Sequence, residues 1–354
     1  MRVLAIAGIL LTLNISAQKD ASWDFEGAAL GGFLMPHHAD MLYLVDGHVT
    51  GGELSMTKRT DGEKDWHPHY LFPRWGVTLN GYKLGSENMG TALAGRIFFD
   101  LPTGKSRTFW MKLSIGAGWI EHPFDIEDNI HNSAIGSHLN ASLAVEAHLN
   151  LNLSEKIVFK PGIGIHHYSN GAMQMPNSGI NLAMLRLAFM YRTKQTEIPT
   201  TERKPVEKTP GQVFIGISGG AKEIKPIGGR TYAVINGFAI WQKRLSPKSS
   251  FGGEIGLNYN ESLQYRSENL NGEDLDPGNN YRAYIAALYQ LHFDPLALRF
   301  GLGTYINPSF TDDGSVFFRY HLVYQLERFQ VFTGLKSHYA KADNIELGMA
   351  YRLK

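Results

Sequence analysis

Long stretches of this chain alternate between apolar and polar residues, and the clearest runs from His138 to Leu153. Its leucines share one face of an extended strand with Ala141, Val145 and Ala147, and Asn140, Glu146 and His148 lie on the other. This run is about three times as long as a usual globular strand. A strand that crosses a bilayer needs about 9–11 residues in the hydrocarbon, and charged residues on its second face suit a barrel lumen. The alternation therefore predicts a membrane-spanning β-strand.

The same alternation recurs along the chain, with about eight candidate strands in residues 20–193 and about eight more in 211–354. Residues 193–212 separate these halves and are rich in proline and charge, which is typical of a linker. An even number of strands returns both chain ends of a barrel to the same side of the membrane. The sequence therefore predicts an all-β chain of two tandem eight-stranded antiparallel transmembrane barrels. The alternative is one barrel of about 14–16 strands with the polar segment as a long turn.

The beginning of the chain has the pattern of an export signal. Arg2 precedes a short apolar run over residues 3–13, and the small residues Ser16 and Ala17 follow. The run is shorter than the roughly 20 apolar residues of a membrane helix, so we expect a signal peptide over residues 1–17. The remaining organisation is then a first barrel unit at 18–193, a linker at 194–210 and a second barrel unit at 211–354.

Composition narrows the class further. Lys and Arg number 34 against 33 Asp and Glu, and this balance lacks the basic surface that nucleic-acid binding requires. The chain has no cysteine, so an exported fold must rely on a large hydrogen-bonded framework or on a membrane. Histidines cluster at 35–40 and 65–70 and suggest zinc, but no third ligand stands at a fixed spacing. We therefore expect no metal and no cofactor.

Three polar residues interrupt faces that should be apolar. His167 and Ser169 share the outward face of their strand with Ile163 and Ile165, and Asn181 lies on the outward, apolar face of the next strand. A polar group on a lipid-facing wall is costly to keep. The alternatives are an aqueous loop above the membrane, where these residues cost little, and a catalytic site.

The catalytic interpretation follows from the types of these residues. A serine hydroxyl becomes a nucleophile when a histidine accepts its proton, and the histidine needs a third group to orient its ring. Ser169, His167 and Asn181 can fill these three roles. Asn170, or a backbone amide nearby such as that of Gly171, can bind an oxyanion.

The stretch "HYSNGAMQMPNSGIN", residues 167–181, resembles the signature of the lipid A 3-O-deacylases, the PagL family, and of their acyloxyacyl-hydrolase-like relatives. The resemblance implies an eight-stranded outer-membrane barrel whose outer-wall site cleaves the ester-linked acyl chain at position 3 of lipid A. It implies His167 as general base, Ser169 as nucleophile and Asn170 at the oxyanion site. The positions that match the connecting turn of the family are Pro176, Asn177 and Gly179.

Two features depart from the family. Asn181 stands where the family has an acid, and an asparagine orients an imidazole without stabilising its cation by charge. The second half has no counterpart in a single-barrel enzyme. A weak internal repeat there matches His338 to His167 and offers Glu346 as an acid, but Ala340 replaces the serine. Alternation also places Glu346 in the lumen, so we expect a non-catalytic pseudo-repeat.

The sequence thus predicts an outer-membrane serine esterase of a Gram-negative bacterium that acts on lipid A or lipopolysaccharide, without a nucleic-acid partner. A non-catalytic outer-membrane barrel, acting as a channel, a structural protein or a lipid binder, is the alternative. The acyl chain that is removed and the oligomeric state stay open.

Overall fold

The computed structural model describes residues 23–194, 210–266, 280–306, 314–339 and 341–353. The expected signal peptide and nearly all of the expected linker lie outside these residues, as does Ala340. The short helical segments are η1 (Ala39–Leu44), α1 (Trp66–His69) and α2 (Ser262–Arg266). Within the described ranges, no helix has the length and apolar character needed to cross a membrane.

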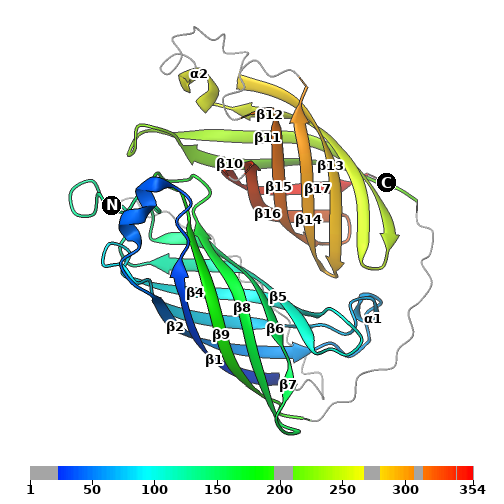
Figure 1. Ribbon diagram of the computed structural model, residues 1–354. Coiled ribbons are helices and arrows are strands. Elements are labelled where there is room, and N and C mark those ends of the chain that lie inside the picture. The colour runs from blue at the N-terminus through cyan, green and yellow to red at the C-terminus, as the bar shows by residue number, and fades with distance from the viewer. Residues whose placement is uncertain (1–22, 195–209, 267–279, 307–313, 340, 354) are drawn as a thin grey trace.

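The first half of the chain forms an antiparallel barrel (Figure 1). Consecutive strands pair, and the barrel closes through β1 with β9 and through β6 with β8. A two-residue strand, β7 (Leu151–Asn152), extends the pairing along β8. The eight principal strands are β1 (Trp23–Leu34), β2 (Val49–Arg59), β3 (Arg74–Lys83), β4 (Thr91–Pro102), β5 (Phe109–Ile120), β6 (Leu139–Leu149), β8 (Ile157–Ser169) and β9 (Ile180–Tyr191).

The second half forms a separate barrel that closes through β10 with β17. The two eight-stranded barrels confirm the tandem prediction and rule out one barrel of 14–16 strands. The strands of the second barrel are β10 (Gln212–Glu223), β11 (Thr231–Ser246), β12 (Ser249–Asn260), β13 (Tyr281–Phe293), β14 (Leu296–Tyr305), β15 (Val316–Gln325), β16 (Phe329–His338) and β17 (Lys341–Arg352).

The predicted alternation is present in both barrels. On β6, Val145 is 49% exposed, whereas its neighbour Glu146 is 2% exposed and faces the lumen. On β17, Leu347 is 60% exposed and Glu346 is fully buried, which confirms the inward direction predicted for Glu346. Both exteriors are therefore apolar walls around polar interiors.

Buried ion pairs fill the lumen of the first barrel. Lys112 Nζ lies 2.6 Å from Glu53 Oε1, and Lys160 Nζ lies 2.7 Å from Glu26 Oε2. Arg186 bridges Glu26 and Glu53 from β9. Each of these charges has a partner, as burial of an ion requires. In the second barrel, Arg319 pairs with Glu254 and Glu346.

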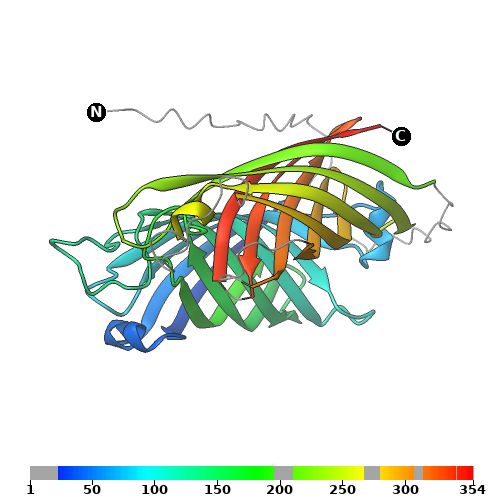
Figure 2. The ribbon, with the colours of Figure 1, turned by 90° about the horizontal axis from the view of Figure 1, so that it is seen from above.

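The two barrels lie side by side (Figures 1 and 2) and are hydrogen-bonded to each other at both ends. We call the end formed by loops 35–48, 84–90, 121–138 and 170–179 the site end of the first barrel. There, residues 170–179 bond to the end of β10. At the opposite end, Phe293 stacks on Tyr70 and Phe99, and Lys64 Nζ donates to the carbonyl of Asp294 at 2.7 Å.

Candidate active site

Strand β8 sends its two adjacent histidines to opposite faces of the barrel wall. His166 is fully buried in the lumen, where Nε2 lies 3.2 Å from Glu146 Oε1 and Nδ1 lies 2.7 Å from the Tyr82 hydroxyl. His167 faces outward and is partly exposed. The period of a β-strand thus gives one structural histidine and one histidine that a substrate in the outer wall can reach.

His167 lies opposite Asn181 in the pairing of β8 with β9. Its Nδ1 is 2.7 Å from Asn181 Oδ1, and the Asn181 Nδ2 group lies 3.2 Å from His37 Nδ1. His37 Nε2 is in turn 2.8 Å from the carbonyl of Ser178. With a neutral His37 that donates from Nε2, the Asn181 amide donates to His37 Nδ1, and the Asn181 oxygen accepts from His167 Nδ1. His167 Nε2 is then the free, basic nitrogen.

Ser169 lies at the end of β8, two residues from His167 on the same face, so their Cα atoms are about 6.6 Å apart. Its side chain is 7% exposed. The backbone N–H of Gly171 donates to Ser169 Oγ at 3.1 Å, and Asn177 Nδ2 donates to it at 3.0 Å. In the described part of the chain, no hydrogen bond joins Ser169 to His167. Catalytic hydrogen bonds are often formed only when substrate binds.

The turn between β8 and β9 is held by its own polar groups. The Asn170 side chain donates to Ser137 Oγ at 2.9 Å and to the carbonyl of Gln174 at 2.7 Å. Asn170 therefore shapes the turn through its amide. Gly179 has a φ of +85°, and a Cβ there would lie 2.9 Å from Cε1 of His167. Only glycine leaves room for the His167 ring at this position.

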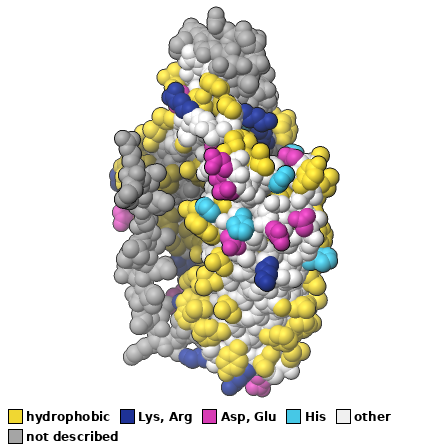
Figure 3. Space-filling view, turned by 90° about the vertical axis from the view of Figure 1, so that its left-hand side faces the viewer, with side chains coloured by type: hydrophobic (Ala, Val, Ile, Leu, Met, Phe, Trp, Pro, Cys, Tyr) yellow, Lys and Arg dark blue, Asp and Glu magenta, His cyan; other side chains and the backbone are white. Residues whose placement is uncertain are grey.

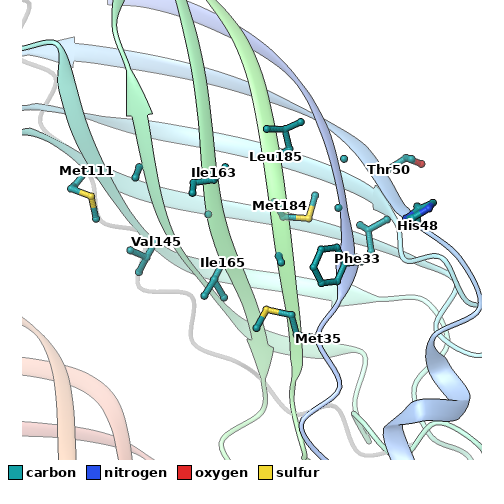
Figure 4. A pocket seen from close by; sticks show the side chains of 16 residues that line it. Phe33, Met35, His48, Thr50, Met111, Val145, Ile163, Ile165, Met184 and Leu185 are labelled. Atoms are coloured by element: carbon teal, nitrogen blue, oxygen red, sulfur yellow. The ribbon is translucent and has the colours of Figure 1, made fainter.

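An apolar depression lies on the outer wall beside these residues (Figure 4). It has a volume of about 890 Å³. Ile165 and Ala183 line it and stand two residues from His167 and Asn181 on the same faces. Phe33, Val145 and Leu185 continue it along the wall. A long apolar group bound in the depression would therefore end next to the polar cluster.

The site end of the first barrel is polar. Figure 3 shows histidine and acidic side chains gathered on this side of the molecule, with hydrophobic side chains over the walls around them. The loops 35–48 and 121–138 of the site end are rich in histidine, aspartate and glutamate. The molecule thus changes from an apolar wall to a polar surface near the strand ends that carry His167 and Ser169.

The other candidates from the sequence do not form sites in the described residues. The histidine clusters at 35–40 and 65–70 lie at opposite ends of the barrel, because β2 separates their loops. Within the described ranges, no group of three or more His, Cys, Asp or Glu side chains is arranged to hold a metal ion. In the second barrel, His338 is 4% exposed and bonds to the carbonyl of Val316, and Glu346 accepts from Asn236 in the lumen.

Sequence reasoning missed two residues at the site. The sequence offers His37 only as part of a histidine cluster, yet it bonds to Asn181 across 144 positions of sequence. The family resemblance implies only a turn position for Asn177, yet its amide donates to Ser169 Oγ. No local signal distinguishes either residue, because both contacts depend on how loops meet in the closed barrel.

Fold and site define the class: a β-barrel with a filled lumen that carries serine, histidine and asparagine side chains on its outer wall. The family described as lipid A 3-O-deacylase (PagL) matches residues 11–190, and the domain described as acyloxyacyl hydrolase, C-terminal domain, matches residues 211–354. The chain belongs to the lipid A 3-O-deacylase family, which confirms the resemblance seen in the sequence.

Other comparisons add little. No curated protein matches the chain. Among solved structures, the KdgM porin in complex with disordered oligogalacturonate is 7% identical, over 93% of this chain and 98% of the porin, with a TM-score of 0.19. A variant of the Rhodopseudomonas blastica porin is 10% identical, over 94% of this chain and 100% of the porin, also with a TM-score of 0.19. Likenesses this weak carry no argument about function.

Proposed function

We propose that this protein is a serine esterase of the outer membrane that hydrolyses the ester-linked acyl chain at position 3 of lipid A. The observation that carries the proposal is the hydrogen-bond chain from His37 through Asn181 to His167. It leaves His167 Nε2 as a base on the same outward face as Ser169. Membership of the lipid A 3-O-deacylase family supplies the substrate class.

The first half-reaction transfers the acyl group to the enzyme. Ser169 Oγ turns from Asn177 toward His167 Nε2, gives it its proton and attacks the ester carbonyl carbon. The N–H of Gly171 and the amide of Asn177, which both donate to Ser169 Oγ in the resting site, are then positioned for the oxyanion. When the ester C–O bond breaks, His167 returns the proton to the sugar oxygen.

In the second half-reaction, water takes the place of the sugar hydroxyl. His167 removes a proton from the water, which attacks the acyl carbon, and Ser169 leaves with that proton as the free acid is released. The site needs no cofactor for these steps. Asn181 holds the ring of His167 throughout but provides no negative charge for the imidazolium, so the chemistry relies more heavily on the oxyanion donors.

The location of the site supports a substrate within the membrane. Both barrels have apolar exteriors, and an even strand number brings the first and the last strand of each barrel to the periplasmic side at their chain ends. The site end then faces outward, where its polar loops would meet the sugar of lipid A. The apolar depression would receive the acyl chain below it.

The proposal is tested with the purified protein in detergent. Ser169→Ala and His167→Asn should each lose deacylation of lipid A while keeping the heat-modifiable migration of a folded barrel. If either variant keeps near-normal turnover, the residue it replaces is not part of the mechanism. A wild-type protein that binds lipid A without cleaving it would instead support the lipid-binding alternative.

A further inference from the structure

The turn that carries the oxyanion donors is bonded to the second barrel as well as to its own. Glu223, the last residue of β10, donates its backbone N–H to the carbonyl of Ala172 at 2.8 Å. The carboxylate of Glu223 accepts from the backbone N–H of Met175 at 3.0 Å. Both contacts fall between Gly171 and Asn177, the two residues that bond to Ser169 Oγ.

The carboxylate of Glu223 is committed to this contact. Glu223 is 6% exposed, and its second carboxylate oxygen accepts from the backbone N–H of Gly228 at 2.5 Å. In the part of the chain that the structure describes, it forms no ion pair with a Lys, Arg or His side chain. A buried carboxylate whose partners are backbone N–H groups makes short, strong, directional hydrogen bonds. It therefore fixes the two backbone segments that it joins.

Strand β17 of the second barrel packs against Gly171, whose N–H is one of the proposed oxyanion donors. Gly171 has a φ of +63°, and a Cβ at this position would lie 2.3 Å from Cγ1 of Ile345 on β17. Ile345 therefore occupies the space directly beside the peptide that donates to Ser169. The second barrel limits where this N–H can move, both by packing and by hydrogen bonds.

We propose that the second barrel is a positioning element of the active site, in which Glu223 and Ile345 hold the 170–177 turn so that its donors point at the oxyanion. This inference rests on the proposed function. A misplacement of about 1 Å can cost a catalytic site about a hundredfold in rate. Such a role would account for a second barrel in which Ala340 stands at the position that matches the serine.

Full-length Glu223→Gln and Glu223→Ala proteins test the proposal by two measurements. Steady-state kinetics on lipid A should show kcat reduced by about tenfold, equivalent to about 1.4 kcal/mol of transition-state stabilisation, with KM nearly unchanged. Hydrogen exchange of the peptide that covers residues 170–177 should be faster than in the wild type. Ile345→Ala, which loosens the packing from another strand, should change both measurements in the same direction.

Glu261→Gln is the matched control. Glu261 is a carboxylate at the same end of the second barrel that bonds to Arg230 and to the N–H of Ala233 within its own barrel. It should leave kcat and the exchange of residues 170–177 unchanged. The proposal is overturned if Glu223→Ala keeps the wild-type kcat, whether or not exchange rises, or if Glu261→Gln lowers kcat equally.

The hydrogen-exchange measurement distinguishes a failure of the proposed deacylase function from a failure of the positioning role. If the wild-type protein does not deacylate lipid A, the proposed function fails, whereas exchange in Glu223→Ala still shows whether the second barrel holds the turn. If hydrogen exchange of residues 170–177 is unchanged in a folded Glu223→Ala protein, the positioning role is contradicted even if the enzyme is active.

Discussion

At the scale of single residues, the site depends on which way one amide group points. Asn181 turns its oxygen toward His167 and its nitrogen toward His37. The reverse orientation would place an N–H against His167 Nδ1 and favour the tautomer that carries hydrogen on Nε2, which cannot accept the proton of Ser169. His37 thus has an indirect part in preparing the general base.

Substitution of Asn181 tests the orienting role. Asn181→Ala should lower kcat by about 10- to 100-fold, less than Ser169→Ala, because the base remains but its ring and tautomer are no longer fixed. Asn181→Glu should keep or raise turnover, because a carboxylate also stabilises the imidazolium. Kinetics on lipid A micelles would measure both effects. Unchanged turnover in Asn181→Ala would exclude Asn181 from the site.

His37 offers a separate test of the amide orientation. His37→Ala should lower kcat several-fold with little change in KM, because the Asn181 amide can then flip. His38→Ala is the control, since its ring contacts that of His37 in a tilted arrangement with centroids 4.7 Å apart but lies outside the hydrogen-bond chain. Equal activities of the two variants would contradict the role assigned to His37.

At the scale of the elements, strands β8, β9 and β1 combine the site with the apolar depression. His167, Asn181 and the end of β1 are adjacent in register, since the N–H of Met35 donates to the carbonyl of Asn181 at 2.8 Å. Ile165, Ala183 and Phe33 are the next outward residues of the three strands. Each strand thus contributes to the polar end and to the apolar wall.

Filling the depression should affect acyl binding more than chemistry. Ala183→Phe adds a ring between Ile165 and Phe33, so we expect a higher KM and a preference for shorter acyl chains, with kcat less affected. Ala239→Phe, which adds the same ring to the outer wall of β11, is the control. Kinetics with lipid A species of different acyl length provide the measurement. Identical length preferences in both variants would show that the acyl chain binds elsewhere.

The sequence predicts the fold best where strands are regular, because side chains there alternate between the two faces. Period-2 alternation gave the inward direction of Glu346 and the outward direction of His167, because neither depends on distant contacts. The alternation at 138–153 overestimated one strand: β6 ends at Leu149 and only the two-residue β7 follows. Alternation records side-chain character, not the turn that begins at Leu153, where hydrogen bonds to Ile157 reverse the chain.

Other features had no periodic signal. In the second barrel, the register of β16 with β17 shifts so that Asp343 has no paired residue, and its side chain is buried beside that of Asn344; a pattern of single residues does not predict such a bulge. The contacts of His37 with Asn181, and of Glu223 with Met175, join segments that are far apart in sequence. They follow from barrel closure and from the packing of two barrels, which local patterns do not contain.

At the scale of the whole molecule, the chain forms two barrels that each close on their own strands. The second barrel contacts the first at the site end. Each barrel has ion pairs of its own in its lumen, such as Lys112 with Glu53 and Arg319 with Glu346. Their contacts at both ends place the ends of β8 and β10 together. The domain boundaries expected from the sequence, with units at 18–193 and 211–354, stay a prediction of independent folding.

Removal of the second unit tests that independence. Residues 18–193 produced alone should fold in detergent as a heat-modifiable barrel, because β1 with β9 and β6 with β8 close it without residues 211–354. Its kcat should be lower than that of the full chain by at least the factor seen in Glu223→Ala. A fragment that stays unfolded would contradict separate units, and a fully active fragment would contradict the positioning role.

The central claim is that Ser169 removes one acyl chain from lipid A, and mass spectrometry of lipid A from cells tests it most directly. Cells that produce the wild-type protein should yield lipid A that lacks one 3-hydroxyacyl group, compared with cells that lack the protein. Cells that produce a folded Ser169→Ala protein in the outer membrane at the same level should yield unmodified lipid A. Unchanged lipid A in the presence of the wild-type protein, or equal deacylation by Ser169→Ala, would contradict the account.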